Sequence, residues 1–356
     1  MKLFNVGAWR PAIDGARLSD ANDLVQRTLA QHGLSSGAGL PNSGGMSTLD
    51  NVLATLSRNH TGGPTSAALP DGAQFNQDTY TCPAGSRMYR TYVPASARDG
   101  ATGVIMMLHG CTQSPEDFAA GTGMNELAEQ HGFVVIYPAQ SRGDNAQSCW
   151  NWFSRGDQRR GRGEPAILAG LATQMATEHG INRDRTFVAG LSAGGAMAAI
   201  LGEAYPDVFA AVGAHSGLPV GAAKDVPSAF AAMGGTILAA PACIQDGRDV
   251  RTIVFHGAAD ATVHPKNGEG IVQRAINRDA INIHETREHG EDNGRKFKRV
   301  IASDDTGAGL VEYWIIEGQG HAWSGGSASG SYTDPRGPSA SAEMVRFFFD
   351  TPREVN

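Results

Sequence analysis

The segment TFVAGLSAGGAMAAIL, residues 186–201, decides the fold of this chain. Its apolar start predicts a buried strand, and its alanine-rich end predicts a helix. Between them lies the pattern G-x-S-x-G, residues 190–194, with Ser192 at its centre. Glycines two residues on either side of the serine let the backbone make a strained turn that presents the hydroxyl above the strand end. The order strand, sharp turn, helix therefore predicts a nucleophile elbow rather than an ordinary glycine-rich turn.

Two later segments supply the partners that such a serine needs, in the chain order serine, acid, histidine. Residues 251–257, RTIVFHG, predict a buried strand, and Asp260 follows it. Residues 310–316, LVEYWII, predict another strand, and His321 follows in the glycine-bounded loop GQGHAW. We expect His321 to take the proton of Ser192 and Asp260 to hold the imidazole in the right tautomer.

The segment GVIMML, residues 103–108, predicts a strand that ends in His109-Gly110-Cys111. An oxyanion hole takes one N–H from such a loop and one from the residue after the nucleophile. The backbone amides of Cys111 and Ala193 are therefore the expected donors to the developing oxyanion.

Several motifs, in the right order, carry a family resemblance: LHGCTQ (108–113), SCWNWF (148–153), GLSAGG (190–195), GHAWSGG (320–326) and SYTDPRGP (331–338). Together they resemble the polyhydroxybutyrate depolymerase family of esterases, over about residues 78–350. The resemblance implies an α/β-hydrolase fold, hydrolysis of carboxylic esters without a cofactor, and relatives among feruloyl and acetylxylan esterases.

Strand and helix patterns alternate from about residue 86 to residue 350, which predicts an α/β protein with a mostly parallel sheet and helices on both faces. Residues 88–93 are expected to form an edge strand. Helices are expected at residues 20–31, 114–131, 163–179, 267–277 and 339–349. We divide the chain into an N-terminal extension, 1–77, with a short helix and a Gly/Ser-rich linker, and a catalytic domain, 78–356.

Composition excludes several classes of partner. The formal net charge of -7 argues against nucleic acid and anionic membranes. The sequence contains no run of 18 apolar residues, so it predicts no membrane-spanning helix. His284 and His289 are five residues apart, which does not place both on one helix face, so we expect no metal site and interpret this Glu-rich stretch as a solvated loop. The family resemblance implies an extracellular protein, but residues 1–10 show no signal-peptide core, so the compartment stays open, as does the oligomeric state.

Four cysteines are present, and two of them follow predicted neighbouring strands. Cys111 follows the strand at 103–108 and Cys149 follows the strand at 133–137. We expect a Cys111–Cys149 disulfide if the protein is exported, and two buried thiols if it stays in a reducing cytosol. Cys82 and Cys243 receive no assigned pairing.

Trp150, Trp152 and Trp323 lie in loops beside the proposed catalytic segments. They are candidates for a flat apolar wall that binds the acyl group, and ordinary core packing is the alternative. His109 is a candidate for shaping the oxyanion loop and touching substrate. His215 and His256 also end apolar strands, where histidines more often shape loops by hydrogen bonding.

The sequence therefore predicts a serine esterase that acts through an acyl-enzyme on a short-chain polyester of the polyhydroxybutyrate type, or on its oligomers. Feruloyl or acetylxylan esterase activity on plant polysaccharide is the first alternative. Hydrolysis of peptides or polyamides on the same fold is another, and a non-catalytic binding protein of hydrolase ancestry is the last.

Overall fold

The structure is a computed structural model that describes residues 69–236, 250–278 and 283–350. The expected helix at 20–31, the linker that follows it and Cys243 lie outside the described residues. The first strand begins at Gln74, so the predicted domain boundary after residue 77 falls inside a strand that is paired along its whole length.

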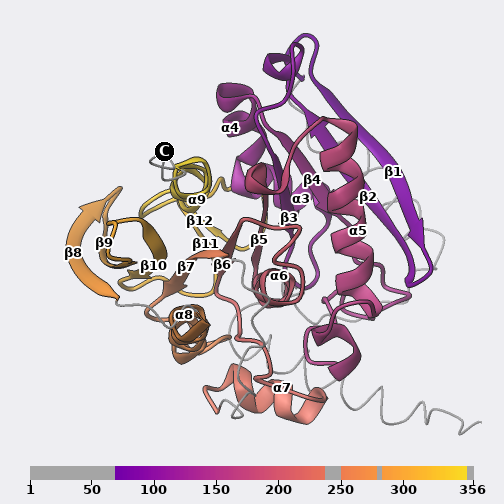
Figure 1. The fold of residues 1–356 in the computed structure, drawn as a ribbon. Coiled ribbons are helices and arrows are strands. Elements are labelled where there is room, and N and C mark those ends of the chain that lie inside the picture. The colour runs from indigo at the N-terminus through magenta and orange to yellow at the C-terminus, as the bar shows by residue number, and fades with distance from the viewer. Residues whose placement is uncertain (1–68, 237–249, 279–282, 351–356) are drawn as a thin grey trace, which may run out of the picture. The chain divides into compact units, whose positions relative to one another are not determined.

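Ten strands of the described chain form one sheet in the order β1-β2-β4-β3-β5-β6-β7-β10-β9-β8 (Figure 1). The six strands from β4 to β10 in this order are parallel, and the strands outside them on both sides are antiparallel. The bounds are β1 (Gln74–Cys82), β2 (Gly85–Val93), β3 (Val104–Leu108), β4 (Val134–Pro138), β5 (Thr186–Leu191), β6 (Ala211–His215), β7 (Arg251–Gly257), β8 (His284–Asp292), β9 (Arg295–Ser303) and β10 (Gly309–Ile316). Two short strands, β11 (Trp323–Ser324) and β12 (Thr333–Asp334), pair separately.

Helices cover both faces of this sheet, as predicted (Figure 1). Alternate residues of a strand point to opposite faces, so Met106 and Leu108 of β3 join one core and Ile105 and Met107 join the other. On the first face lie α5 (Gly163–Glu178), α6 (Ala193–Ala204) and α8 (Lys266–Arg278); on the second lie α3 (Pro115–Thr122), α4 (Met124–His131) and α9 (Ala340–Phe349). The remaining helical segments are α7 (Val226–Met233), η1 (Ala95–Ala97), η2 (Arg155–Gln158) and η3 (Arg183–Arg185).

The helix expected at 114–131 is two helices in the structure. Ser114 caps α3, because its hydroxyl accepts the Asp117 N–H, and Gly123 ends α3 in the left-handed conformation with φ of 63°. The break at Gly123 limits α3 to eight residues, and its N-cap Ser114 directly follows residues 109–113.

Two further elements differ from the sequence prediction. Residues 284–292 form strand β8 of a hairpin with β9, rather than a loop. The turn is Asn293-Gly294, and both residues have positive φ, 42° and 75°, as a type I′ turn requires. Residues 88–93 belong to β2, which is not at the edge of the sheet because β1 pairs outside it.

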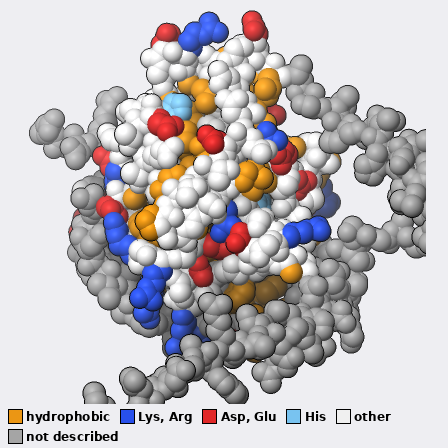
Figure 2. Space-filling view, turned by 90° about the vertical axis from the view of Figure 1, so that its right-hand side faces the viewer, with side chains coloured by type: hydrophobic (Ala, Val, Ile, Leu, Met, Phe, Trp, Pro, Cys, Tyr) orange, Lys and Arg blue, Asp and Glu red, His pale blue; other side chains and the backbone are white. Residues whose placement is uncertain are grey.

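The surface carries side chains of both charge signs. Figure 2 shows acidic and basic side chains interspersed over the face that lies on the right of Figure 1, the side of β1, β2 and α5. No helix in the described residues is long and apolar enough to cross a membrane.

Candidate active site

The sheet topology brings the three predicted catalytic residues to one edge. β5, β6, β7 and β10 are consecutive parallel neighbours, so their carboxyl ends lie on the same side of the sheet. Ser192 directly follows β5, Asp260 follows β7 by three residues, and His321 follows β10 by five. This edge is where parallel α/β sheets assemble their functional loops.

Ser192 sits in the strained turn that the G-x-S-x-G pattern predicts. Its φ is 58° and its ψ is −119°, and its N–H donates to the His215 carbonyl at 2.9 Å. A Cβ on Gly194 would lie 2.0 Å from the Leu108 carbonyl oxygen, and one on Gly190 would lie 2.5 Å from the Gly194 backbone. The two glycines are therefore required by close backbone packing, and they hold the half-buried serine at the N-terminus of α6.

Asp260 and His321 are hydrogen-bonded to one another. The His321 Nδ1–H donates to Asp260 Oδ2 at 2.8 Å, and the other carboxylate oxygen accepts the N–H groups of Thr262 at 3.0 Å and Val263 at 2.8 Å. Burial raises the pKa of the Asp260 carboxyl, but His321, His256 and the Val263 amide outweigh burial and leave that pKa below its usual value. The group is therefore a carboxylate at neutral pH, suited to hold the imidazole with its proton on Nδ1.

The serine and the histidine lie at the same edge of the sheet but do not contact each other through a hydrogen bond. Among the described residues, no hydrogen bond joins the Ser192 hydroxyl to His321. Catalytic hydrogen bonds often tighten only once substrate is bound, so this arrangement remains compatible with a serine–histidine pair.

Within the described chain, the backbone amides of Cys111 and Ala193, both near Ser192, donate to no acceptor. In contrast, the Gly110 N–H donates to Gln113 Oε1 at 2.9 Å and the Thr112 N–H donates to the Gln147 carbonyl at 2.8 Å. A Cβ on Gly110 would lie 3.6 Å from the Ser192 Cβ, which places this turn against the serine. Free amides at such a place can bind an oxyanion, and the amide of Ala193 also lies at the N-terminus of α6.

The predicted disulfide is present. Cys111 and Cys149 are 38 residues apart, and their Cα atoms lie 4.3 Å apart across the bridge. Their strands β3 and β4 are parallel neighbours, so the loops that follow them meet at the same edge. Cys82, at the end of β1, is a free cysteine.

We expect Cys111→Ser and Cys149→Ser to have the same effect, because either change opens the same bridge. On the chain-entropy model the bridge contributes about 4 kcal/mol, so the denaturation midpoint should fall by roughly 8 °C. Activity should fall only modestly, since the backbone amide of residue 111 remains. Thermal melts and initial rates measure both effects, and Cys82→Ser is the matched control that should change neither. Unequal midpoints for the two bridge variants would contradict the shared role.

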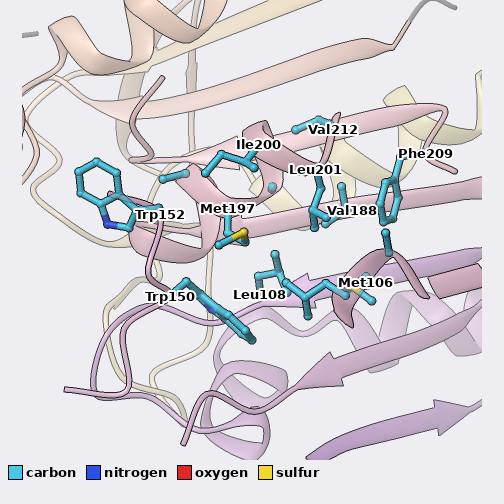
Figure 3. Packing of buried hydrophobic residues seen from close by; sticks show 14 of the residues in the cluster. Met106, Leu108, Trp150, Trp152, Val188, Met197, Ile200, Leu201, Phe209 and Val212 are labelled. Carbon is cyan, nitrogen blue, oxygen red and sulfur yellow. The ribbon is translucent and has the colours of Figure 1, made fainter. Parts of the chain in front are cut away.

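The predicted aromatic wall is not on the surface. The side chains of Trp150 and Trp323 are fully buried, and Trp152 is buried as well. Figure 3 shows Trp150 and Trp152 among core residues of β3, β5 and α6. The indole N–H of Trp150 donates to the His109 carbonyl at 3.0 Å, and that of Trp323 donates to the Ser341 hydroxyl at 3.0 Å. The sequence located these rings in the right loops, but they point into the core and support the loops rather than facing a substrate.

The three strand-end histidines are also inside. Burial lowers the pKa of His109 to about 4, and burial likewise lowers the pKa of His215 and His256. His109 Nδ1–H donates to the Gly110 carbonyl, and its Nε2 accepts the Gln140 N–H. His215 Nε2 accepts the Ser324 N–H, which ties the β6 end to the loop after His321. All three are neutral groups that shape loops, so His109 does not lie where it could touch a substrate.

A buried glutamate supports the loop that follows β4, and the sequence alone does not predict this role. Glu164, at the start of α5, is buried and accepts hydrogen bonds from the backbone N–H and the side chain of Asn151, and from Gln140 Nε2. It thereby fixes the loop that carries Cys149 and Trp150. No local pattern marks it, since a glutamate in the first turn of a helix is common on surfaces.

Comparison with known proteins identifies the family. The sequence model described as Esterase PHB depolymerase matches residues 87–293, more than half of the chain. The chain belongs to this family. It is 33% identical over 251 residues to poly(3-hydroxyalkanoate) depolymerase C of Paucimonas lemoignei, which covers 68% of this chain and 59% of that protein. It is 30% identical over 203 residues to the probable acetylxylan esterase A of Aspergillus flavus, which covers 52% of this chain and 64% of that protein.

The chain thus spans less than two thirds of the length of these two curated relatives. Among solved structures, the acetyl xylan esterase from Aspergillus awamori aligns with a TM-score of 0.59 at 21% identity, over 70% of this chain and 94% of that one. This similarity supports the α/β-hydrolase fold.

In the part of the chain that the structure describes, no group of three His, Cys, Asp or Glu side chains could hold a metal ion.

Proposed function

We propose that this member of the family is a serine esterase that hydrolyses carboxylic esters through an acyl-enzyme. Ser192 is the nucleophile, His321 the base, Asp260 the residue that orients the base, and the amides of Cys111 and Ala193 form the oxyanion hole. The observation that carries this proposal is the Asp260–His321 hydrogen bond at the sheet edge that also bears the Ser192 elbow.

The proposed mechanism starts from the His321 ring nitrogen that is not bonded to Asp260. Because His321 Nδ1–H is engaged with Asp260, the lone pair of Nε2 is available for the Ser192 proton. The serine oxygen attacks the ester carbonyl, Nε2 takes its proton, and the carbonyl oxygen becomes an oxyanion that the two amides stabilise. The imidazolium returns the proton to the departing alcohol, which leaves the acyl group on Ser192. Water, deprotonated by the same imidazole, then releases the acid and restores the serine.

For the substrate we propose a short-chain polyester of the polyhydroxybutyrate type, or its oligomers. The family match and the similarity to a poly(3-hydroxyalkanoate) depolymerase support this choice. Esters of plant polysaccharide, such as acetylated xylan or feruloyl groups, are the second candidate, supported by the similarity to acetylxylan esterases. The Cys111–Cys149 disulfide supports action outside a reducing cytosol.

Initial rates on a 3-hydroxybutyrate trimer, acetylated xylan and methyl ferulate test the proposal. We expect the hydroxybutyrate trimer to give the highest kcat/KM, and Ser192→Ala to abolish hydrolysis of all three. A fluorophosphonate should label Ser192 in the wild-type protein. Faster hydrolysis of acetylated xylan or methyl ferulate would replace the polyester by the polysaccharide ester. No hydrolysis and no labelling would overturn the esterase itself.

A further inference from the structure

A cluster of polar side chains links the proposed oxyanion hole to a loop near the C-terminus. We call residues 109–113 the oxyanion turn and residues 327–332 the C-terminal loop. The turn follows β3, and the loop lies between β11 and β12, more than 200 residues later in the chain. Most of the contacts between the two pass through one side chain, that of Gln113.

Gln113 is 5% exposed and uses both ends of its amide. Its Oε1 accepts the Gly110 N–H at 2.9 Å, while its own backbone N–H donates to the Gly110 carbonyl at 3.3 Å. Its Nε2 donates to Asp117 Oδ2 at 3.0 Å, to the Ser331 carbonyl at 3.0 Å and to the Ser331 hydroxyl at 3.2 Å. The acceptor end therefore closes the oxyanion turn, and the donor end ties it to fixed partners outside.

Those partners are themselves held in place. Asp117 lies in the first turn of α3, where its N–H is capped by the Ser114 hydroxyl at 3.2 Å. Its Oδ1 accepts the Ser331 N–H at 2.9 Å, and its Oδ2 accepts the Ser331 hydroxyl. The carboxylate of Asp117 thus binds the C-terminal loop and the Gln113 amide at the same time.

The C-terminal loop also packs on α3 through its backbone. The Ser327 N–H donates to the Gly121 carbonyl at 2.8 Å, and a Cβ on Gly330 would lie 2.4 Å from the Gly121 backbone. At the far end, the Tyr332 and Thr112 hydroxyls lie 3.1 Å apart and are hydrogen-bonded. The loop is therefore a fixed support against which the oxyanion turn is held at two neighbouring residues, Thr112 and Gln113.

We propose that Gln113 is a positioning residue for the oxyanion hole, a role that rests on the proposed esterase function. Cys111 lies inside the turn that Gln113 closes, between Gly110 and Thr112, whose amides are both engaged, so that only the Cys111 N–H is left for a ligand. An oxyanion donor works only when its direction is set before the reaction. Holding the turn in this way needs an acceptor and a donor on one neutral side chain, which glutamine supplies. A glutamate at position 113 would lack the donor and would face the Asp117 carboxylate, and an alanine would lack both groups.

The test compares Gln113→Ala with wild type on an aryl acetate and on its thiono analogue, in which sulfur replaces the carbonyl oxygen. Sulfur accepts hydrogen bonds weakly, so the thiono ester gains little from the oxyanion hole. We expect kcat for the oxo ester to fall about 10- to 100-fold with little change in KM, and the rate on the thiono ester to fall less than about 3-fold. Ser331→Ala should give a smaller loss, because the Ser331 carbonyl still accepts from Gln113.

Gln158→Ala is the matched control. The Gln158 side chain also ties separate segments together through its Nε2, which donates to the carbonyls of Trp152 and Ala223, but within the described chain it makes no hydrogen bond to the oxyanion turn. It should leave the oxo-to-thiono rate ratio unchanged. An equal loss on both esters in Gln113→Ala would assign this residue a purely structural role and overturn the inference. A wild-type protein that hydrolyses neither ester would instead overturn the proposed function, so the two failures are distinguishable.

Discussion

Ser192→Ala and His321→Ala should each lower kcat by about 10⁶-fold, and the double variant should be no slower than either single one. The reason is that neither residue works without the other: the imidazole has no proton to take without the serine, and the hydroxyl is not activated without the imidazole. The residual rate comes from substrate binding and the oxyanion amides. Burst and steady-state kinetics on an aryl acetate measure the three values.

His179→Ala serves as a control for removal of an imidazole. His179 is half-buried at the C-terminal end of α5 and belongs to no catalytic element. It should retain wild-type kcat, and thermal melts should show that Ser192→Ala is folded. Losses that multiply in the double variant would mean that Ser192 and His321 act in separate steps, and the proposed triad would then be wrong.

The sequence predicted the centre of the fold because the signals there are local. β5 is an uninterrupted apolar run, fully buried on both faces, and the elbow glycines follow it at fixed spacing. β3 is likewise a fully buried apolar run, and β7 and β10 are mostly apolar and mostly buried. The edge of the sheet that collects Ser192, Asp260 and His321 is therefore predictable from the sequence. The Cys111–Cys149 bridge was predictable for the same reason, since both cysteines follow neighbouring parallel strands.

The sequence does not predict the strands that lack an apolar pattern. β8 has an almost entirely exposed sequence, HETREHGED, and it is a strand because it pairs with β9, not because it buries a face. The Asn293-Gly294 turn was the available signal, since this dipeptide favours a tight hairpin. β1 was missed in the same way: most of its side chains are exposed, and its pairing with β2 defines it.

The direction of a side chain within a loop was the hardest feature to predict. Trp150 and Trp323 were placed beside the catalytic elements correctly, but their rings point into the core, where their N–H groups find buried acceptors. Gln113 illustrates the opposite case. It belongs to the LHGCTQ motif, but the sequence assigns it no role, because its partner Ser331 is 218 residues away and only the folded chain brings them together.

Asp260→Asn should lower kcat by about 10⁴-fold, and the hydrogen bonds around the carboxylate explain why. Oδ1 accepts two backbone N–H groups, from Thr262 and Val263, so the oxygen of an asparagine must stay at that position. Its NH₂ group then faces His321 Nδ1, where the carboxylate had been an acceptor. The imidazole can accept that hydrogen bond only with its own proton on Nε2, and in that tautomer it cannot take the Ser192 proton.

Asp260→Asn should therefore be at least as harmful as Asp260→Ala, because alanine removes the orienting group without enforcing the wrong tautomer. Asp304→Asn is the matched control: Asp304 Oδ1 also accepts two backbone N–H groups, from Thr306 and Ala308, in the exposed connection between β9 and β10. It should keep wild-type kcat on an aryl acetate. Near-normal activity of Asp260→Asn, with the protein folded by thermal melt, would show that His321 takes its orientation from another group and would remove Asp260 from the triad.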